Sequence, residues 1–309
     1  MAEAPVWNVL VLPVLLGAGA VAALVFDASL AARAAGRPVS ASAALSAPLR
    51  AVVRLLITQR RTTAAADAVL WRTGVVLVPV LAVLAGSVLP LGGVAVSDLA
   101  VGVVWFNAME ILTWAAVWMA GWGPNAALSL VGGYRFVAQG LAYELPHMFA
   151  LITAATGAGT LRVGGIVEAQ SGLWFVVWMP VAFVVYLLSA MAMAFWGPFD
   201  APLGHDLAGG AAGESSGVDR LVFLGGRWLL LVVAVAMAVP LFLGGGGGPW
   251  LPGWVWTVLK TAAVLGVVVW VGRRFPTVRM ERFAEFAWVV LVPLTVLQAL
   301  VVALVVLVR

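Results

Sequence analysis

The stretch "YRFVAQGLAYELPHMFALI", residues 134–152, is apolar enough to cross a membrane, yet it carries several polar side chains. Arg135, Gln139, Tyr143 and His147 follow one another at intervals of four residues. Because residues four apart lie above one another on an α-helix, these side chains form one slanted stripe. The sequence therefore predicts a polar stripe on a helix that is otherwise apolar.

The composition of the whole chain agrees with a membrane location. Of its 309 residues, 64% are hydrophobic and 10% are charged, and the mean hydropathy is +1.10. A soluble domain is about 25% charged. Lipid allows only helices or closed barrels, and the apolar runs here are continuous rather than alternating. We therefore predict an all-α polytopic membrane protein that forms a single membrane domain over residues 1–309.

The apolar runs divide into eight expected spans. Each has about 20 residues, the length needed to cross the hydrocarbon core. The spans are about 8–26, 69–91, 100–121, 136–157, 173–195, 221–243, 254–272 and 286–308.

The segment between the first two spans, 27–68, is expected to hold one amphipathic helix, at about 47–61. Its apolar residues recur at helical spacing with arginines elsewhere, as in helices that lie in the membrane interface. Pro48 suits the first turn of such a helix.

The arginines predict the orientation. Segment 27–68 holds six arginines and segment 273–285 holds four, whereas the loops on the other side hold only Arg162. Positively charged loops stay in the cytoplasm. Segments 27–68, 196–220 and 273–285 are therefore expected to be cytoplasmic, and both termini to lie on the outer side. Because the basic residues flank apolar helices, no nucleic-acid partner is expected.

Two acids fall inside expected spans, Glu110 in the third and Glu144 in the fourth. A carboxylate at membrane depth costs several kcal/mol unless it is paired, protonated or hydrated. Such a group either carries protons or makes a structural hydrogen bond between helices. Glu144 lies three residues before His147 and beside the break expected at Pro146, so a cluster of Glu110, Glu144 and His147 is geometrically feasible.

Other residue types limit the chemistry of the chain. It has no cysteine, which excludes disulfides, thiolate-held zinc and iron–sulfur ligation by this chain. Neither a bound metal nor a bound cofactor is expected.

The single lysine, Lys260, lies within the seventh span. It either pairs with one of the buried acids or extends to an interface.

Two loops have unusual compositions. Loop 196–220 contains Asp200, Asp206 and Glu214 on a side that is otherwise rich in arginine. It is either a solvated connection or the mouth of a proton path or a docking surface. The run of five glycines at 244–248 is expected to be a flexible outward turn.

Several motifs together resemble one family, the H subunit (mitochondrial subunit-1 equivalent) of respiratory complex I, NADH:quinone oxidoreductase. "AGWGPNAALSLVGGYRFVAQGLAYELP" resembles the family pattern "GWxSNxKYxLLGxxRxxAQxxSYE". "PFDAPLGHDLAGGAAGESSG" resembles "PFDxPEAExELxxGxxxEYSG", and "LFLGG", "LKT" and "RRFPTVRMERFAEFAWVVLVPLTVLQ" resemble the last two helices.

The resemblance implies a function. The family subunit joins a peripheral iron–sulfur arm to antiporter-like membrane subunits in the bacterial inner membrane, and quinone reacts at its interface with partners. It implies that Glu144, Asp200, Asp206 and Glu214 are acids of the proton path or quinone site, and that Arg135 is a positioning charge. The expected cytoplasmic segments would contact the peripheral arm.

The chain also departs from the family pattern. "FDASLAARAAGRPVSAS" replaces a motif with a glutamate and a GPNR turn, and "PLGHDL" is one residue shorter and two acids poorer than "PEAExEL". Arg227 falls near a family glutamate, and Glu110 lies where the family has small or apolar residues.

The equivalent subunit of a membrane-bound hydrogenase or other ferredoxin-linked ion pump is an alternative function. A stand-alone secondary transporter is a remote one, because neither internal repeats nor paired broken helices are visible.

Overall fold

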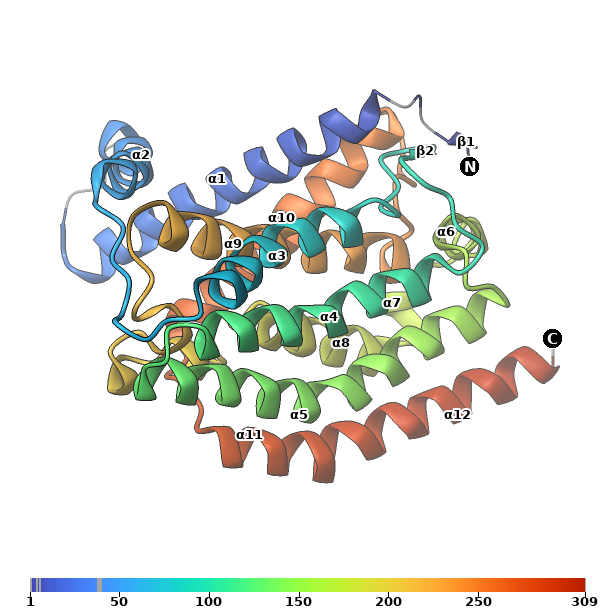
Figure 1. The fold of residues 1–309 in the computed structure, drawn as a ribbon. Coiled ribbons are helices and arrows are strands. Elements are labelled where there is room, and N and C mark those ends of the chain that lie inside the picture. The colour runs from blue at the N-terminus through green and yellow to red at the C-terminus, as the bar shows by residue number, and fades with distance from the viewer. Residues whose placement is uncertain (1, 4, 6, 38–40, 309) are drawn as a thin grey trace.

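The computed structural model describes residues 2–3, 5, 7–37 and 41–308, and it is a bundle of α-helices (Figure 1). The only strands in the described residues are two short segments, β1 and β2. They pair in parallel, with Ala2 opposite Val94. The helices are α1 Asn8–Ala34, α2 Ala41–Ile57, α3 Ala68–Gly86, α4 Gly102–Trp122, α5 Ala127–Ala158, α6 Val163–Ala169, α7 Phe175–Trp178, α8 Pro180–Met193, α9 Gly217–Phe242, α10 Gly253–Arg274, α11 Met280–Phe286 and α12 Val292–Val308, with β1 at Ala2–Glu3 and β2 at Val94–Ala95.

Six helical stretches among the described residues are long and apolar enough to cross a membrane: α1, α3, α4, α9, α10 and the combined run Met280–Val308. The pair α5 and α6 is a seventh candidate, bent by 60° at the break between them. These helices confirm the all-α polytopic fold.

The expected fifth span is not one continuous helix. It is divided into α7 and the 14-residue α8 at Met179, because Pro180 begins a new helix and cannot donate a backbone hydrogen bond to the preceding turn. At about 1.5 Å per residue, α8 is about 21 Å long, shorter than the roughly 30 Å hydrocarbon core.

The boundaries of other elements also differ from prediction. The first helix continues to Ala34 rather than ending at 26, so Asp27 lies inside it. The amphipathic helix α2 begins at Ala41, and Pro48 lies in its interior rather than in its first turn. The alanine-rich sequence before Pro48 favours helix, which explains the earlier start. In the last span, a π-helical turn at Ala287–Leu291 precedes Pro293, whose missing N–H removes a regular helical bond.

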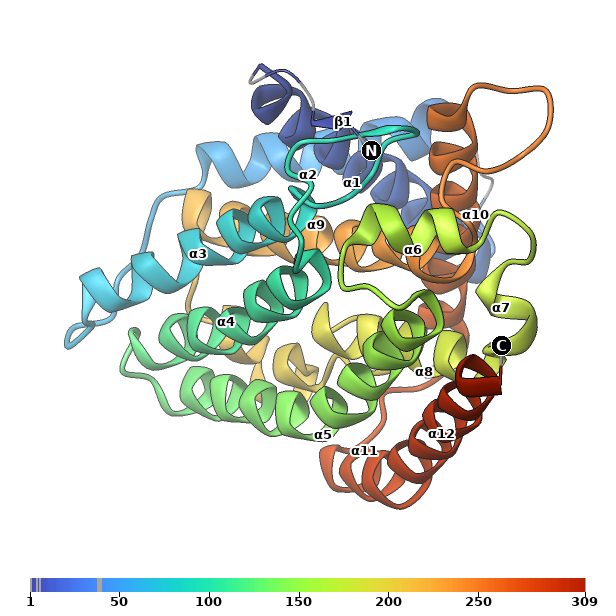
Figure 2. The same ribbon diagram turned by 90° about the vertical axis from the view of Figure 1, so that its right-hand side faces the viewer.

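The bundle has two distinct ends. In Figures 1 and 2, α2 lies across one end and α6 across the other, and these are called the α2 end and the α6 end below. The start of α1 and the end of α12 both lie at the α6 end. At the α2 end, Arg60 pairs with Asp219, and Thr277 donates to Asp200, so three long connections meet there.

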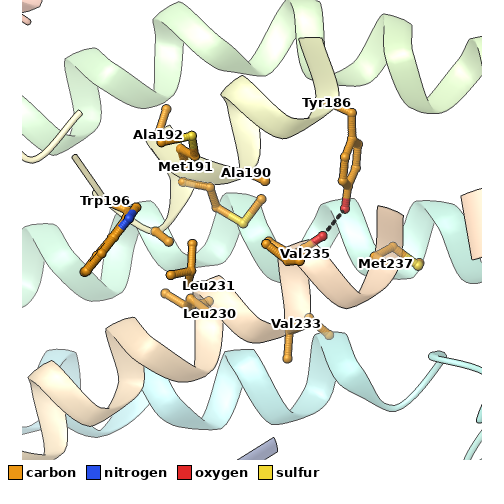
Figure 3. Close-up of a cluster of buried hydrophobic side chains, with 14 of the residues drawn as sticks. Tyr186, Ala190, Met191, Ala192, Trp196, Leu230, Leu231, Val233, Val235 and Met237 are labelled. Carbon is orange, nitrogen blue, oxygen red and sulfur yellow. Dashed lines mark hydrogen bonds between the residues drawn. The ribbon is translucent and has the colours of Figure 1, made fainter. Parts of the chain in front are cut away.

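The core is formed around α9, which packs against α1, α3, α8 and α10. Figure 3 shows the apolar contact between α8 and α9, in which the hydroxyl of Tyr186 donates to the carbonyl oxygen of Ala234 at 2.7 Å. Gly74 allows α3 to approach α4 closely, because a Cβ atom there would lie 2.5 Å from the carbonyl oxygen of Ala116. In contrast, α1 and the last span are mostly exposed along the bundle.

Candidate functional site

The polar stripe of α5 faces the interior of the bundle, and each of its members contacts a different neighbour. Arg135, nearest the α2 end, donates from both terminal nitrogens to the Asp206 carboxylate at 2.7 and 3.2 Å. This guanidinium lowers the pKa of the Asp206 carboxyl below its ordinary value, chiefly through these hydrogen bonds. Arg135 also donates to the carbonyl of Ala201, so it holds the loop against α5.

The next two members join α5 to α8 and α4. The amide of Gln139 donates to the carbonyl oxygens of Ala192 at 2.6 Å and Phe199 at 2.9 Å. The hydroxyl of Tyr143 accepts from the indole N–H of Trp114 at 2.9 Å. Gly140 leaves room for that indole, since a Cβ atom at this position would lie 2.4 Å from the ring. The stripe is therefore embedded in helix contacts over three successive turns.

The fourth member, His147, meets Glu110 of α4. The Nε2 atom of His147 lies 2.8 Å from Oε2 of Glu110, and both side chains are almost completely buried. The imidazole packs beside the rings of Tyr186 and Phe106. Its Nδ1 atom and Oε1 of Glu110 have no hydrogen-bond partner among the described residues.

Glu144 lies next to this pair. Its Oε1 atom accepts a hydrogen bond from the amide of Asn107 at 2.9 Å, while its buried Oε2 atom has no partner among the described residues. Buried polar atoms in native proteins are normally hydrogen-bonded, so several unpartnered ones in one place need an explanation. The structure thus brings Glu110, Glu144 and His147 together. Helical spacing predicts that Glu144 lies near His147, and the packing of α4 on α5 adds Glu110.

The three acids of loop 196–220 lie in different surroundings. Only Asp206 reaches the α5 stripe. Asp200 accepts a hydrogen bond from the hydroxyl of Thr277 at 2.7 Å, and Glu214 is exposed away from the stripe. A polar cavity of about 680 Å³ opens beside the Arg135–Asp206 pair and is also lined by Thr277, Arg279, Glu281 and Arg282.

Lys260 contacts the backbone of the glycine turn rather than an acid. Its ammonium donates to the carbonyl oxygens of Leu243, Gly245 and Gly247 at 2.7, 2.9 and 2.7 Å, and it lies 4.1 Å from the ring centre of Trp174. It forms no ion pair with an acid among the described residues. It is buried at the α6 end, and its hydrogen bonds join α10 to the glycine turn and to the residue before it.

Sequence reasoning missed two charged contacts. Asp27 binds the guanidinium of Arg273 through both oxygens at 2.5 Å, and it was overlooked because the first span was expected to end one residue earlier. Arg227 donates to the carbonyl of Phe195 at 2.7 Å and to that of Ala194 at 3.3 Å. It thereby satisfies carbonyls at the end of α8, which a helix end leaves without partners.

An apolar cavity of about 490 Å³ lies between α1, α2, α3 and α9. Gly17 and Val21 line it from α1, and Val52 and Leu55 line it from the amphipathic helix. Pro79 and Gly226 lie at its inner wall. Within the described residues, no group of three or more metal-ligating side chains is placed to hold a metal ion.

Comparison with known proteins gives one consistent result. Residues 7–303 match the sequence model of the NADH dehydrogenase family. The chain is 37% identical over 263 residues to an H-type subunit of the NADH-quinone oxidoreductase of Rhodopseudomonas palustris, covering 83% of this chain and 81% of the relative. It is 34% identical to the corresponding subunit of Geobacter metallireducens, covering 82% and 80%, and 34% identical to that of Geobacillus kaustophilus, covering 82% and 78%.

These relatives are subunits of NADH-quinone oxidoreductases. The comparison therefore favours a quinone oxidoreductase subunit over the equivalent subunit of a hydrogenase. The helical fold and the apolar spans agree with a subunit that has no independent catalysis and works within an oxidoreductase complex. The chain belongs to the NADH dehydrogenase family and is an H-type membrane subunit of a complex I-like NADH:quinone oxidoreductase.

Proposed function

We propose that Glu144, Glu110 and His147 carry protons through the middle of this subunit when its complex reduces quinone. The observation that supports this most strongly is a set of buried oxygen and nitrogen atoms on all three side chains that have no hydrogen-bond partner in the described part of the chain. A purely structural polar contact would satisfy these atoms, whereas a proton carrier needs free sites. Proton-carrying residues must also connect with water or with further polar groups.

The α5 stripe supplies such a connection toward the α2 end. From His147 to Arg135 it covers 12 residues, or about 18 Å along the helix. We propose that Asp206, Asp200 and Glu214 form the mouth of the path at the α2 end. Of these acids, Asp206 lines the polar cavity beside Arg135. His147 can bind a proton on one ring nitrogen and release one from the other, which suits a relay between the two acids.

We propose that the quinone tail occupies the apolar cavity between α1, α2, α3 and α9. Its lining is almost wholly apolar and its size suits an aliphatic or isoprenoid chain. The exposed arginines of α2 and its apolar residues favour a position at a membrane surface, where a quinone could enter from the lipid. The reactive quinone ring would lie toward the loops of the α2 end.

We propose that the α2 end faces the cytoplasm and contacts the peripheral iron–sulfur arm, while antiporter-like subunits adjoin the bundle within the membrane. The arginine-rich segments gather at this end, as cytoplasmic loops do. The subunit would then lie in the bacterial inner membrane with both termini on the outer side. Redox chemistry in the partners would change the charge near Asp206 and alter proton binding along the path.

The test is Glu144→Gln in the assembled complex reconstituted in liposomes. The amide keeps the size of the side chain but cannot release a proton. We expect normal assembly and loss of most of the proton transport that accompanies quinone reduction, by at least about tenfold. Glu168→Gln on α6 is the matched control and should transport protons normally. Normal transport in Glu144→Gln would remove this residue from the path.

A further inference from the structure

A second apolar groove follows the opposite face of α1, where this helix meets α10. It consists of two adjoining cavities of about 380 and 240 Å³. Ala22, Ala262 and Leu265 line both of them. The groove is separate from the proposed quinone cavity, which uses Gly17, Ala20, Val21 and Leu24 of α1.

The groove is open because small residues line it along α10. A Cβ atom added to Gly266 would have no neighbour within 4 Å, so the space beside this residue is free. Along α10 the lining extends from Thr257 to Val269, which is about 18 Å at 1.5 Å per residue. A helix about 10 Å wide cannot enter cavities of this volume, whereas a single hydrocarbon chain can.

The end of the groove nearest α2 carries positive charge. There Asp27 neutralises Arg273 through a two-point ion pair. The next residue, Arg274, lies 5.5 Å from the ring centre of Trp270, is exposed, and makes no ion pair with any described residue. Gly266, Trp270 and Arg274 follow one another at intervals of four residues, so the open groove leads directly to a free guanidinium.

We propose that this groove binds one anionic phospholipid, with an acyl chain between α1 and α10 and the headgroup phosphate at Arg274. The hydrocarbon of one leaflet is about 15 Å thick, which corresponds to ten residues of helix, from Trp270 to the level of Lys260. The chain therefore fits within the length of the groove. Exposed tryptophan and arginine at a helix end are also the side chains that meet lipid headgroups.

The bound lipid has a structural consequence for α1. Only four residues of this helix are buried, Leu16, Ala20, Ala23 and Asp27. A lipid chain in the groove would cover one face of α1 while the opposite face lines the apolar cavity. We expect the lipid to stabilise the position of α1, whatever occupies the other cavity.

The experiment uses the purified complex and counts the phospholipids that remain bound, by native mass spectrometry and phosphate analysis after detergent washing. Gly266→Leu fills the groove, and Ala263→Leu is the matched control because Ala263 is an exposed residue of the same helix outside the groove. We expect Gly266→Leu to lose one retained phospholipid and Ala263→Leu to keep it. Ala262→Leu fills the same groove and replaces Gly266→Leu if that variant does not assemble.

The headgroup is tested with Arg274→Gln. Phosphatidylglycerol added to the delipidated complex should raise its apparent unfolding temperature more than phosphatidylcholine does, and this preference should be lost in Arg274→Gln. Equal lipid retention in Gly266→Leu, Ala262→Leu and Ala263→Leu would overturn the proposal. Loss of a protein subunit rather than a lipid from the groove-filling variants would also overturn it, because the occupant would then be a partner helix.

Discussion

Lys260 and Glu110 are both ionisable side chains buried among apolar helices, and their surroundings differ. The ammonium of Lys260 has three hydrogen-bond donors, and the structure provides three carbonyl acceptors within 2.9 Å. Glu110 has one oxygen near His147 and another that has no hydrogen-bond partner among the residues that the structure describes. A fully satisfied buried charge stabilises one conformation, whereas an incompletely satisfied one remains free to exchange protons.

This contrast distinguishes two uses of buried polarity in one bundle. At the α6 end, Lys260 joins α10 to the turn that follows α9, and Trp174 covers the cation. In the middle of the bundle, Glu110, Glu144 and His147 lie together, and the described part of the chain does not supply hydrogen-bond partners for all their polar atoms. We therefore expect substitutions at the α6 end to change stability most, and substitutions in the middle to change proton transport most.

The largest loss of stability is expected for Lys260→Met. Methionine keeps much of the apolar stem but leaves three carbonyl oxygens without their donor. Hydrogen bonds to charged groups contribute about 1.5–3 kcal/mol each, and their effects are not additive, so a loss of about 3 kcal/mol or more is expected. The apparent unfolding temperature of the purified complex measures it. If Lys260→Met unfolds at the wild-type temperature, Lys260 does not stabilise the turn.

A smaller loss is expected for Asp27→Asn. The change removes a two-point ion pair between α1 and α10 in which Arg273 remains partly exposed to solvent. Solvent reduces the contribution of such a pair, so we expect about 1–2 kcal/mol. The apparent unfolding temperature should fall. Limited proteolysis should also cleave the segment after α1 faster than in wild type, because α1 is held less firmly against α10. Equal proteolysis of wild type and variant would contradict this role.

Glu110→Gln should hardly change stability. Glutamine keeps the size of the side chain and an oxygen that can accept a hydrogen bond from His147, and it removes a carboxyl group whose charged form burial disfavours. The expected change in unfolding free energy is therefore within about 1 kcal/mol. A loss as large as that of Lys260→Met would show that Glu110 is a structural group. Such a result would remove the distinction between the two regions.

The smallest effect is expected for Asp206→Asn. Arg135 lowers the pKa of this carboxyl in the folded state, so the pair stabilises the fold above the unfolded pKa of about 4. That stability is lost only as pH falls through the lowered folded pKa. Because Asp206 is exposed, the contribution is about 0–1 kcal/mol. The unfolding temperatures of variant and wild type should differ by the same small amount from pH 8 to pH 5; a difference that varies over this range would contradict the assignment.

The sequence predicts the parts of this molecule that depend on local pattern. Hydropathy locates the spans, and the spacing of four residues places Arg135, Gln139, Tyr143 and His147 on the inner face of α5. It also places Glu144 close to His147, three residues later on the same helix. These features depend only on helical geometry and on the high cost of polar groups in lipid.

Other features depend on contacts between distant segments and could not be predicted. The partners of Lys260 are backbone carbonyls of a turn, which have no signature in the side-chain sequence. The break before Pro180 had a visible signal in that proline, but the length of the apolar run obscured it. The Asp27–Arg273 pair joins residues 246 positions apart, so only the packing of α1 on α10 reveals it.

The most direct test is the number of protons transported per quinone reduced in liposomes that contain the complex with Glu110→Gln. Glu168→Gln serves as the control acid outside the path. Our account predicts that Glu110→Gln assembles, keeps a wild-type unfolding temperature and moves far fewer protons per quinone, whereas Glu168→Gln matches wild type. A wild-type ratio of protons to quinone in Glu110→Gln would contradict the account and return the Glu110–His147 pair to a role in helix packing.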